Sequence, residues 1–223
     1  MLRPTYLNLA KPLFCMRNEA VKKYVKKYSL GIVEVENSLE RYNSFFRNMG
    51  FKETIEEMVE KRLEDRVFVT VMDIGCGNGG FLADLKKRFD EEVHTMGVDL
   101  LAAEKMPDKM VIGDAAEVEF PMGIDFIFSF RSLHEIGEPE KMVEKIYSSL
   151  TSGGKAFLSF RTMDLYIGGK GLAELGEKEI KALQQMVRKS NFKNIKIKGF
   201  EVNANDENGK KHTAGVNIFL EKE

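Results

Sequence analysis

The run from Val71 to Gly80, VMDIGCGNGG, constrains the fold of this chain more than any other feature. Just before the glycines, residues 67–73 form a short apolar stretch rich in β-branched side chains, which predicts a buried strand. The glycines follow at the end of that strand, where a parallel sheet opens a crevice for ligands. Gly75 and Gly77 allow a tight turn and a close approach of the backbone to a bound molecule. We therefore expect an α/β domain with a binding site at this turn.

Short apolar runs alternate with amphipathic stretches in the rest of the chain, a pattern typical of βαβ units. The last two strands are joined through Asn208-Gly209, a turn dipeptide, and the connection is too short for a crossover helix. We expect a Rossmann-like α/β fold whose seven-stranded sheet is mostly parallel with an antiparallel last strand, with helices on both faces and an N-terminal helical cap. The predicted strands are residues 67–73, 93–99, 110–114, 125–130, 155–160, 195–202 and 215–221, and the predicted helices are 80–89, a short one at 101–106, 138–150 and 177–190.

Helical spacing of apolar side chains dominates the first 65 residues. We therefore predict two parts, an N-terminal helical cap of residues 1–65 and a ligand-binding domain of residues 66–223. The predicted cap helices cover residues 21–28, 38–49 and 52–65.

Composition argues against several classes of protein. The formal net charge is -1, so the chain as a whole has no field that attracts nucleic acid or an anionic membrane. Its two cysteines, Cys15 and Cys76, lie far apart, and no CxxC pair or histidine cluster predicts a metal site or a disulfide framework. No stretch approaches the roughly 20 apolar residues of a membrane span, and no secretory signal is evident. We expect a cytoplasmic protein that binds neither metal nor membrane.

Three acidic residues fall at the ends of successive predicted strands, where their side chains can reach the crevice. A pyrophosphate would repel the carboxylate of Asp73, whereas an ammonium group would be attracted to it. Asp99 can accept hydrogen bonds from both hydroxyls of a ribose, and Asp114 can accept one from an adenine amino group. Because the glycines also satisfy the dinucleotide pattern GxGxxG, the carboxylates rather than the glycines distinguish the ligand. The alternatives are that Asp114 caps its own turn and that Asp99 is a surface residue.

The segments DIGCGNGG, GVDL, GDAAE, DFIFSFRSLHEI and LTSGGKAFLSF resemble, in order and spacing, the motifs of class I S-adenosylmethionine (SAM)-dependent methyltransferases. The resemblance covers about residues 67–222 and implies SAM as the cofactor. Because helices before the first strand often close over the cofactor in this family, Tyr42, Phe45 and Phe46 either do so or pack in the core. Cys76 has a simpler interpretation as a small residue that fills the turn, rather than as a nucleophile. The cofactor-binding residues implied by the resemblance are Asp73, Gly75, Cys76, Gly77, Asp99, Leu100, Asp114, Ala115 and Ser129.

The fourth predicted strand ends in SFRSLHEI, and its last residues are placed beside the transferable methyl group. Methyl transfer is an in-line displacement, so a base is needed only when the acceptor must lose a proton. His134 is the candidate base because imidazole accepts a proton near neutral pH, and the alternative is that it packs over the cofactor or orders the loop. Arg131 either binds an anionic substrate or pairs with Glu135. These three are the predicted catalytic residues.

The residues at this turn also bear on the class of molecule that accepts the methyl group. Enzymes that methylate exocyclic amino groups of bases carry Asn/Asp-Pro-Pro-Tyr here, whereas this chain has Ser129 to Ser132, SFRS. A Leu-His pair at this turn is frequent in family members that act on small molecules. The resemblance therefore implies methyl transfer to an oxygen or nitrogen of a small molecule. Two alternatives stay open, an RNA or protein methyltransferase and a SAM-binding scaffold without catalysis.

Two segments bear on those alternatives. Residues 1–28 carry seven Lys or Arg against one Glu. Such a basic patch with tyrosines either faces RNA phosphates and stacks on bases or forms the solvated face of a helix buried on its other side. Residues 161–175, with Arg161 and Tyr166, form either a wall of the substrate pocket or a plain surface excursion.

Overall fold

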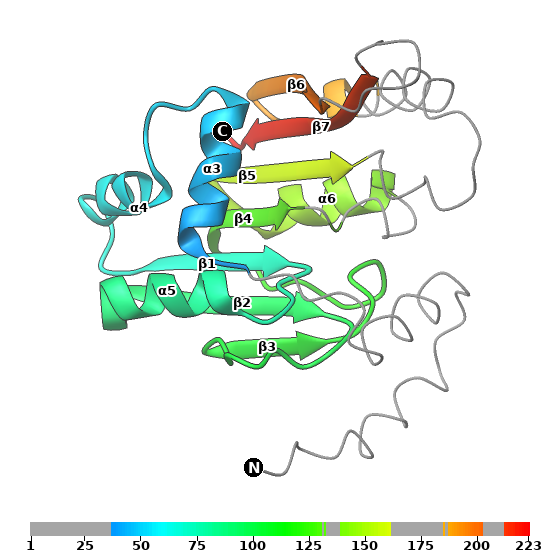
Figure 1. The fold of residues 1–223 in the computed structure, drawn as a ribbon. Helices are drawn as coiled ribbons and strands as arrows, with labels where there is room; N and C mark the ends of the chain where they lie inside the picture. The colour runs from blue at the N-terminus through cyan, green and yellow to red at the C-terminus, as the bar shows by residue number, and fades with distance from the viewer. Residues whose placement is uncertain (1–36, 131, 133–138, 162–184, 186, 203–211) are drawn as a thin grey trace.

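A seven-stranded sheet forms the centre of the protein (Figure 1). The computed structural model describes residues 37–130, 132, 139–161, 185, 187–202 and 212–223. The described strands are β1 (Val69–Ile74), β2 (Val93–Asp99), β3 (Lys109–Ile112), β4 (Ile124–Phe130), β5 (Leu150–Arg161), β6 (Asn194–Val202) and β7 (His212–Glu221). The described helices are α3 (Leu39–Met49), α4 (Ile55–Leu63), α5 (Gly80–Phe89), the 3-10 turn η2 (Asp90–Glu92) and α6 (Pro139–Ser149).

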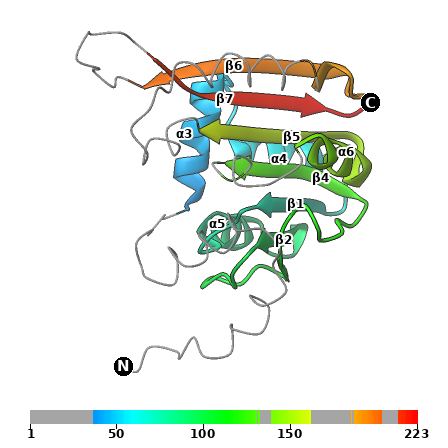
Figure 2. The same ribbon diagram turned by 90° about the vertical axis from the view of Figure 1, so that its right-hand side faces the viewer.

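The strands lie in the order β3-β2-β1-β4-β5-β7-β6, with β1 and β4 near the middle. The pairs from β3 to β5 are parallel, whereas β7 is antiparallel to both β5 and β6. Figure 2 shows the β7 arrow pointing against those of its neighbours. The predicted Rossmann-like sheet with a reversed last strand is confirmed.

Apolar side chains alternate along the strands and face two separate cores, as the pleat of a strand requires. In β1, Val69 and Val71 face the core covered by α3, α4 and α5, whereas Met72 and Ile74 face the core covered by α6. Asp73 has the same parity as Val69 and Val71, so its side chain lies on the face covered by α3 and α5. Elements on that face of the sheet, such as α3 and α5, can therefore contact Asp73.

One helix prediction is wrong. The short helix expected at residues 101–106 is absent, and those residues form bends and irregular structure between β2 and β3. Lys105 N donates to Asn78 O at 2.9 Å, so its backbone is bonded to the glycine turn rather than to its own segment. Pro107 further disfavours helical geometry at the residue before it. The helix expected at residues 177–190 lies largely outside the described residues, although residues 185, 187 and 188 are helical.

The described part of the N-terminal segment packs directly on the sheet. Helix α3 is capped by the side chain of Ser38 and ends at Gly50, whose φ is +87°. Its buried stripe includes Phe46, whose ring centre lies 4.4 Å from that of Phe157 in β5. The division of the chain at residue 65 stays a prediction, but α3 shares one hydrophobic core with the strands. In the part of the chain that is described, no helix is long and apolar enough to cross a membrane.

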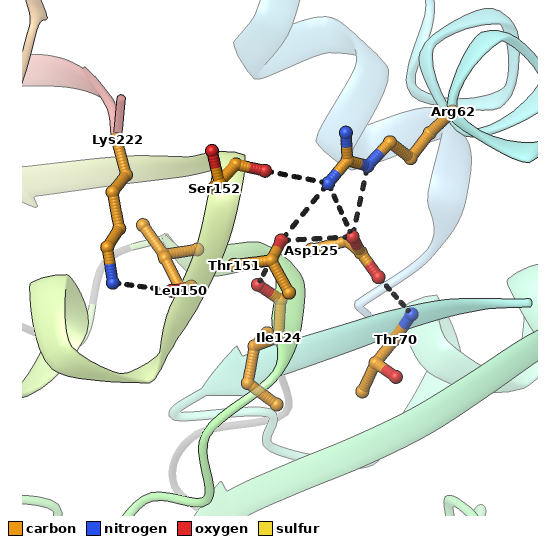
Figure 3. A network of polar contacts seen from close by, with 8 residues as sticks. All are labelled: Arg62, Thr70, Ile124, Asp125, Leu150, Thr151, Ser152 and Lys222. Carbon is orange, nitrogen blue, oxygen red and sulfur yellow. Dashed lines mark hydrogen bonds and ion pairs between the residues drawn. The ribbon is translucent and has the colours of Figure 1, made fainter. Parts of the chain in front are cut away.

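Arg62 fastens α4 to the amino end of β4 through a buried polar network (Figure 3). Its Nε donates to Asp125 Oδ1 at 3.0 Å, and Nη2 donates to Thr151 Oγ1 and to the carbonyl oxygen of Ser152. The other carboxylate oxygen of Asp125 accepts from Thr70 N at 3.0 Å. Because Asp125 is only 2% exposed, its charge depends on these partners.

We expect Arg62→Ala to lower the free energy of unfolding by about 3 kcal/mol, because it leaves the Asp125 charge buried without its cation. The control is Arg88→Ala, which removes an ion pair with Glu60 that is about half exposed on both sides. That change should cost less than about 1 kcal/mol. Urea denaturation of both variants measures the difference, and equal losses would contradict this account.

Candidate cofactor site

The glycine turn joins β1 to α5 at the carboxyl end of β1 (Figure 1). Gly75, Gly77 and Gly79 have φ values of +77°, +56° and +76°, a region that residues with a side chain adopt only at a cost. Gly75 N and Cys76 N both donate to the carbonyl oxygen of Val98, which fixes the turn against β2. The local sequence therefore folds as expected because three glycines stand where the backbone is left-handed.

Ser132, the described residue that follows β4, lies against this turn. Ser132 Oγ donates to the carbonyl oxygen of Ile74 at 2.7 Å and lies 2.7 Å from Ser129 Oγ, which donates to the same carbonyl. A methyl group on Gly75 would overlap the Ser132 side chain. Gly75 is therefore required for a close approach as well as for its φ, and the two serines join the ends of β1 and β4.

The start of α3 also lies against the turn. Asn37 Nδ2 donates to the carbonyl oxygen of Cys76 at 3.0 Å, and Leu39 N donates to Asp84 Oδ2 on α5 at 3.0 Å. A methyl group on Gly77 would lie 2.8 Å from Asn37 Nδ2. Three segments distant in sequence thus meet at the glycines.

Asp73 is completely buried at the end of β1. Its Oδ2 accepts a hydrogen bond of 2.7 Å from the hydroxyl of Tyr42, whereas its Oδ1 has no hydrogen-bond partner among the described residues. Burial raises the pKa of this carboxyl to about 8, against the lowering effect of the Tyr42 hydrogen bond and with a further rise from the charge of Asp99. At neutral pH the carboxyl is therefore mostly protonated, and a positive charge placed beside it would favour loss of the proton.

Asp99, at the end of β2, orders the turn. Its Oδ2 accepts from Gly77 N at 2.9 Å, and its Oδ1 accepts from Leu101 N at 3.2 Å. Burial raises the pKa of Asp99, while these backbone hydrogen bonds lower it. Each carboxylate oxygen has a second lone pair, so the group can also accept hydrogen bonds from ligand hydroxyls. Next to it, Leu100 is half-buried.

Asp114 caps its own turn, because its Oδ1 accepts from Ala116 N at 2.9 Å. The loop that follows is held by Lys145 of α6, whose Nζ donates to the carbonyl oxygens of Ala115, Ala116 and Val118. One ammonium group thus satisfies three carbonyls of the segment in which the adenine contact is predicted.

Cys76 points into the protein. It is fully buried, and its Sγ lies 3.9 Å from Met110 Sδ. A methyl group on Gly97 would lie 2.8 Å from Cys76 Sγ. Burial, followed by the charges of Asp73 and Asp99, raises the pKa of the thiol well above its usual range. A thiol held neutral in this way fills space and is not a nucleophile.

The structure brings together the predicted residues at the ends of β1, β2 and β4 but leaves the predicted catalytic group undescribed. Arg131, His134 and Glu135 lie outside the described residues, as do Tyr166 and the basic residues 1–28. Arg161 belongs to β5, but its side chain is not described. The described residues include no group of three or more His, Cys, Asp or Glu side chains that could hold a metal.

Four contacts of this region were not predicted from the sequence, those of Asn37, Tyr42, Ser132 and Lys145. The motif Asn37-Ser38 before an apolar stripe signals the start of a helix, but its contact with the glycine turn is tertiary. Tyr42 was expected to close over the ligand or to pack in the core, and its hydrogen bond to Asp73 was not foreseen. Nothing in the local sequence marks Ser132 or Lys145, because both act on segments far away in the chain.

The arrangement fits a ligand that combines a ribose with a cationic amino group. The unpartnered Asp73 Oδ1 provides a buried acceptor for an ammonium group, and Asp99 provides free lone pairs for hydroxyls. The left-handed glycines Gly75 and Gly77 let the backbone approach such a ligand closely. SAM has these groups, so the described residues fit it.

Comparison with known proteins agrees with this fit. Residues 72–158 match the family model described as a methyltransferase domain. Together with the strand order, this match supports the resemblance to class I SAM-dependent methyltransferases seen in the sequence.

Three individual proteins illustrate what this chain is similar to. Phosphoethanolamine N-methyltransferase 2 of Caenorhabditis elegans is 30% identical over 149 residues, and the match covers 60% of this chain and 32% of that protein. This chain therefore spans about a third of the length of that relative. The structure of Haemonchus contortus phosphoethanolamine N-methyltransferase 2 has a TM-score of 0.51 at 18% identity, covering 74% of this chain and 52% of that one. The CurJ carbon methyltransferase has a TM-score of 0.51 at 15% identity, covering 75% and 52%.

The close approach at the glycine turn can be tested with two alanine substitutions. Gly123 has a φ of +91°, and a methyl group added there would meet nothing within 4 Å, so Gly123→Ala should cost only the conformational penalty of about 1–2 kcal/mol. Gly75→Ala should lower the free energy of unfolding by at least about 3 kcal/mol, because it also overlaps Ser132. Adding Ser132→Gly should recover part of that loss. Equal effects of both alanines in thermal denaturation would show that no close approach exists.

Proposed function

We propose that this chain binds SAM at the glycine turn and transfers its methyl group to the nitrogen of a small-molecule amine. The observation that carries the proposal is the buried Asp73 carboxyl with one unpartnered oxygen, placed beside a turn that matches the methyltransferase family. A buried acceptor without a partner is costly, and a bound ammonium group removes that cost.

Each predicted residue has a role in holding the cofactor. Asp73 binds the amino group of the methionine moiety, and Asp99 binds the ribose hydroxyls. The loop of Asp114 and Ala115, which Lys145 holds in place, binds the adenine. SAM, when bound, supplies a methyl group on a sulfonium, and the thioether that is left behind is neutral, so its departure requires no proton transfer. The remaining predicted cofactor contacts are Gly75, Cys76 and Gly77 through their backbone, Leu100, and Ser129 at the end of β4.

The nature of the acceptor is proposed from the relatives. Two of them are named as phosphoethanolamine N-methyltransferases, which makes phosphoethanolamine the first acceptor to test. An alkylammonium has no free lone pair at neutral pH, so it must lose a proton before its nitrogen attacks. His134 is proposed as the group that takes this proton, and Arg131 as the partner of an anionic phosphate. Glu135 is proposed as the partner of either His134 or Arg131. A cytoplasmic location is proposed from the cysteine usage, and Cys76 is a free, buried thiol.

We expect SAM binding at pH 6.5 to release about one proton. Asp73, with its pKa raised to about 8, is protonated before binding and becomes a carboxylate beside the ammonium group. Calorimetry in buffers of different ionisation enthalpy measures the release. Asp73→Asn should bind more weakly and release none, whereas the exposed control Asp65→Asn should behave as the unmodified protein. Binding without proton release by the unmodified protein would show that Asp73 does not meet the ammonium group.

Turnover tests the acceptor and the base. We expect transfer of a labelled methyl group from SAM to phosphoethanolamine, and a loss of kcat of about 100-fold or more in His134→Ala with unchanged affinity for S-adenosylhomocysteine. His94→Ala is the control, because His94 is exposed and stacks on Phe68. No methylation of any small amine, together with transfer to RNA or protein, would favour the alternative acceptors. Tight cofactor binding with no transfer at all would indicate a scaffold.

A further inference from the structure

Among the described residues, Asn37, which precedes α3, and Leu39 and Tyr42, which belong to it, form hydrogen bonds to the glycine turn, α5 and β1. The first two bond to the backbone of the glycine turn and to α5. Only the Tyr42 hydroxyl bonds to the side chain to which the proposed function assigns the cofactor's positive charge, Asp73. Tyr42 is therefore the residue through which α3 can act on ligand binding.

The Tyr42 side chain is held so that its hydroxyl has a fixed position. The residue is 1% exposed. Its ring stacks on Phe81 with the ring centres 3.9 Å apart and the planes 12° apart, and Phe130 packs edge-on at 4.8 Å. Phe81 belongs to α5 and Phe130 ends β4, so the ring is fixed from two elements that border the glycine turn.

This fixed hydroxyl makes the two oxygens of Asp73 unequal. Oδ2 receives the hydrogen bond of 2.7 Å, while Oδ1, equally buried, receives none from the described residues. A carboxylate is symmetric by itself, so the external donor decides which oxygen is left to accept from a ligand. Without that donor both oxygens would be buried and unpartnered.

We propose that Tyr42 is a positioning residue of the cofactor site: its hydroxyl holds Asp73 so that Oδ1 receives the ammonium group of the cofactor. The inference rests on the proposed function and assigns Tyr42 to one part of the ligand, the amino-acid moiety. The nucleoside part is bound elsewhere, by Asp99 and the loop after β3, and does not depend on Tyr42.

Charge supports the same assignment. The Tyr42 hydrogen bond lowers the pKa of Asp73, whereas burial and the charge of Asp99 raise it. Burial, and then Asp73, raise the pKa of Tyr42 itself, so the phenol stays protonated and remains a donor. Loss of the hydroxyl therefore leaves Asp73 harder to ionise, and a cationic ligand would bind it less well.

The test compares two ligands that differ only in the amino-acid moiety, S-adenosylhomocysteine and 5′-methylthioadenosine. In Tyr42→Phe, which keeps the ring, we expect calorimetry to show S-adenosylhomocysteine binding about 10- to 100-fold more weakly, the usual effect of losing a hydrogen bond to a charged group. The affinity for 5′-methylthioadenosine should change by less than about threefold. In an Asp73→Asn background, Tyr42→Phe should have little further effect, because the carboxylate that it positions is gone.

A matched control separates positioning from support of the fold. Phe46→Leu alters another buried aromatic residue of α3 and should lower stability while preserving the ratio of the two affinities. If Tyr42→Phe weakens both ligands equally, or neither, the inference is wrong. If the unmodified protein binds neither ligand, the proposed function fails first, and the two failures are thereby distinguished.

Discussion

The arrangement of the cofactor site depends on a single buried carboxyl group, that of Asp73. Asp73 lies at the end of a central strand, is fully buried, and has no access to water. Placing an acid there costs free energy unless hydrogen bonds or an opposite charge compensate it. The protein supplies one hydrogen bond, from Tyr42, and leaves the rest of the cost for a ligand to remove.

Much of the surrounding architecture serves that one group. For Tyr42 to reach Asp73, α3 must lie on the same face of the sheet as α5, and the apolar stripe of α3 holds it there against β4 and β5. For a ligand to approach the strand ends, the turn that follows must occupy very little space. The glycines provide this, with Ser132 and Asn37 packed where side chains would otherwise stand.

The fold was predictable because its signals are local. Runs of apolar residues predicted all seven strands to within a few residues, and the Asn208-Gly209 dipeptide predicted that the last strand is reversed. Predictions failed or stopped where distant segments decide the outcome. Residues 101–106 are not helical because Lys105 bonds to the glycine turn, and the link from Tyr42 to Asp73 spans 31 positions. Composition and spacing carry no trace of such contacts. The strand-end carboxylates were found because strand ends are readable from the sequence.

Strand β4 carries two separate tasks at its two ends. At its amino end Asp125 belongs to the ion-pair network of Arg62, and at its carboxyl end Ser129 joins the residues beside the proposed methyl acceptor. The distance along the strand keeps these tasks apart, so sequence changes in the acceptor region need not weaken the network that secures α4. Substitutions near the proposed acceptor can therefore leave the Arg62–Asp125 network intact. They are constrained instead by Ser129 and Phe130, which contact β1 and Tyr42 at that end of the strand.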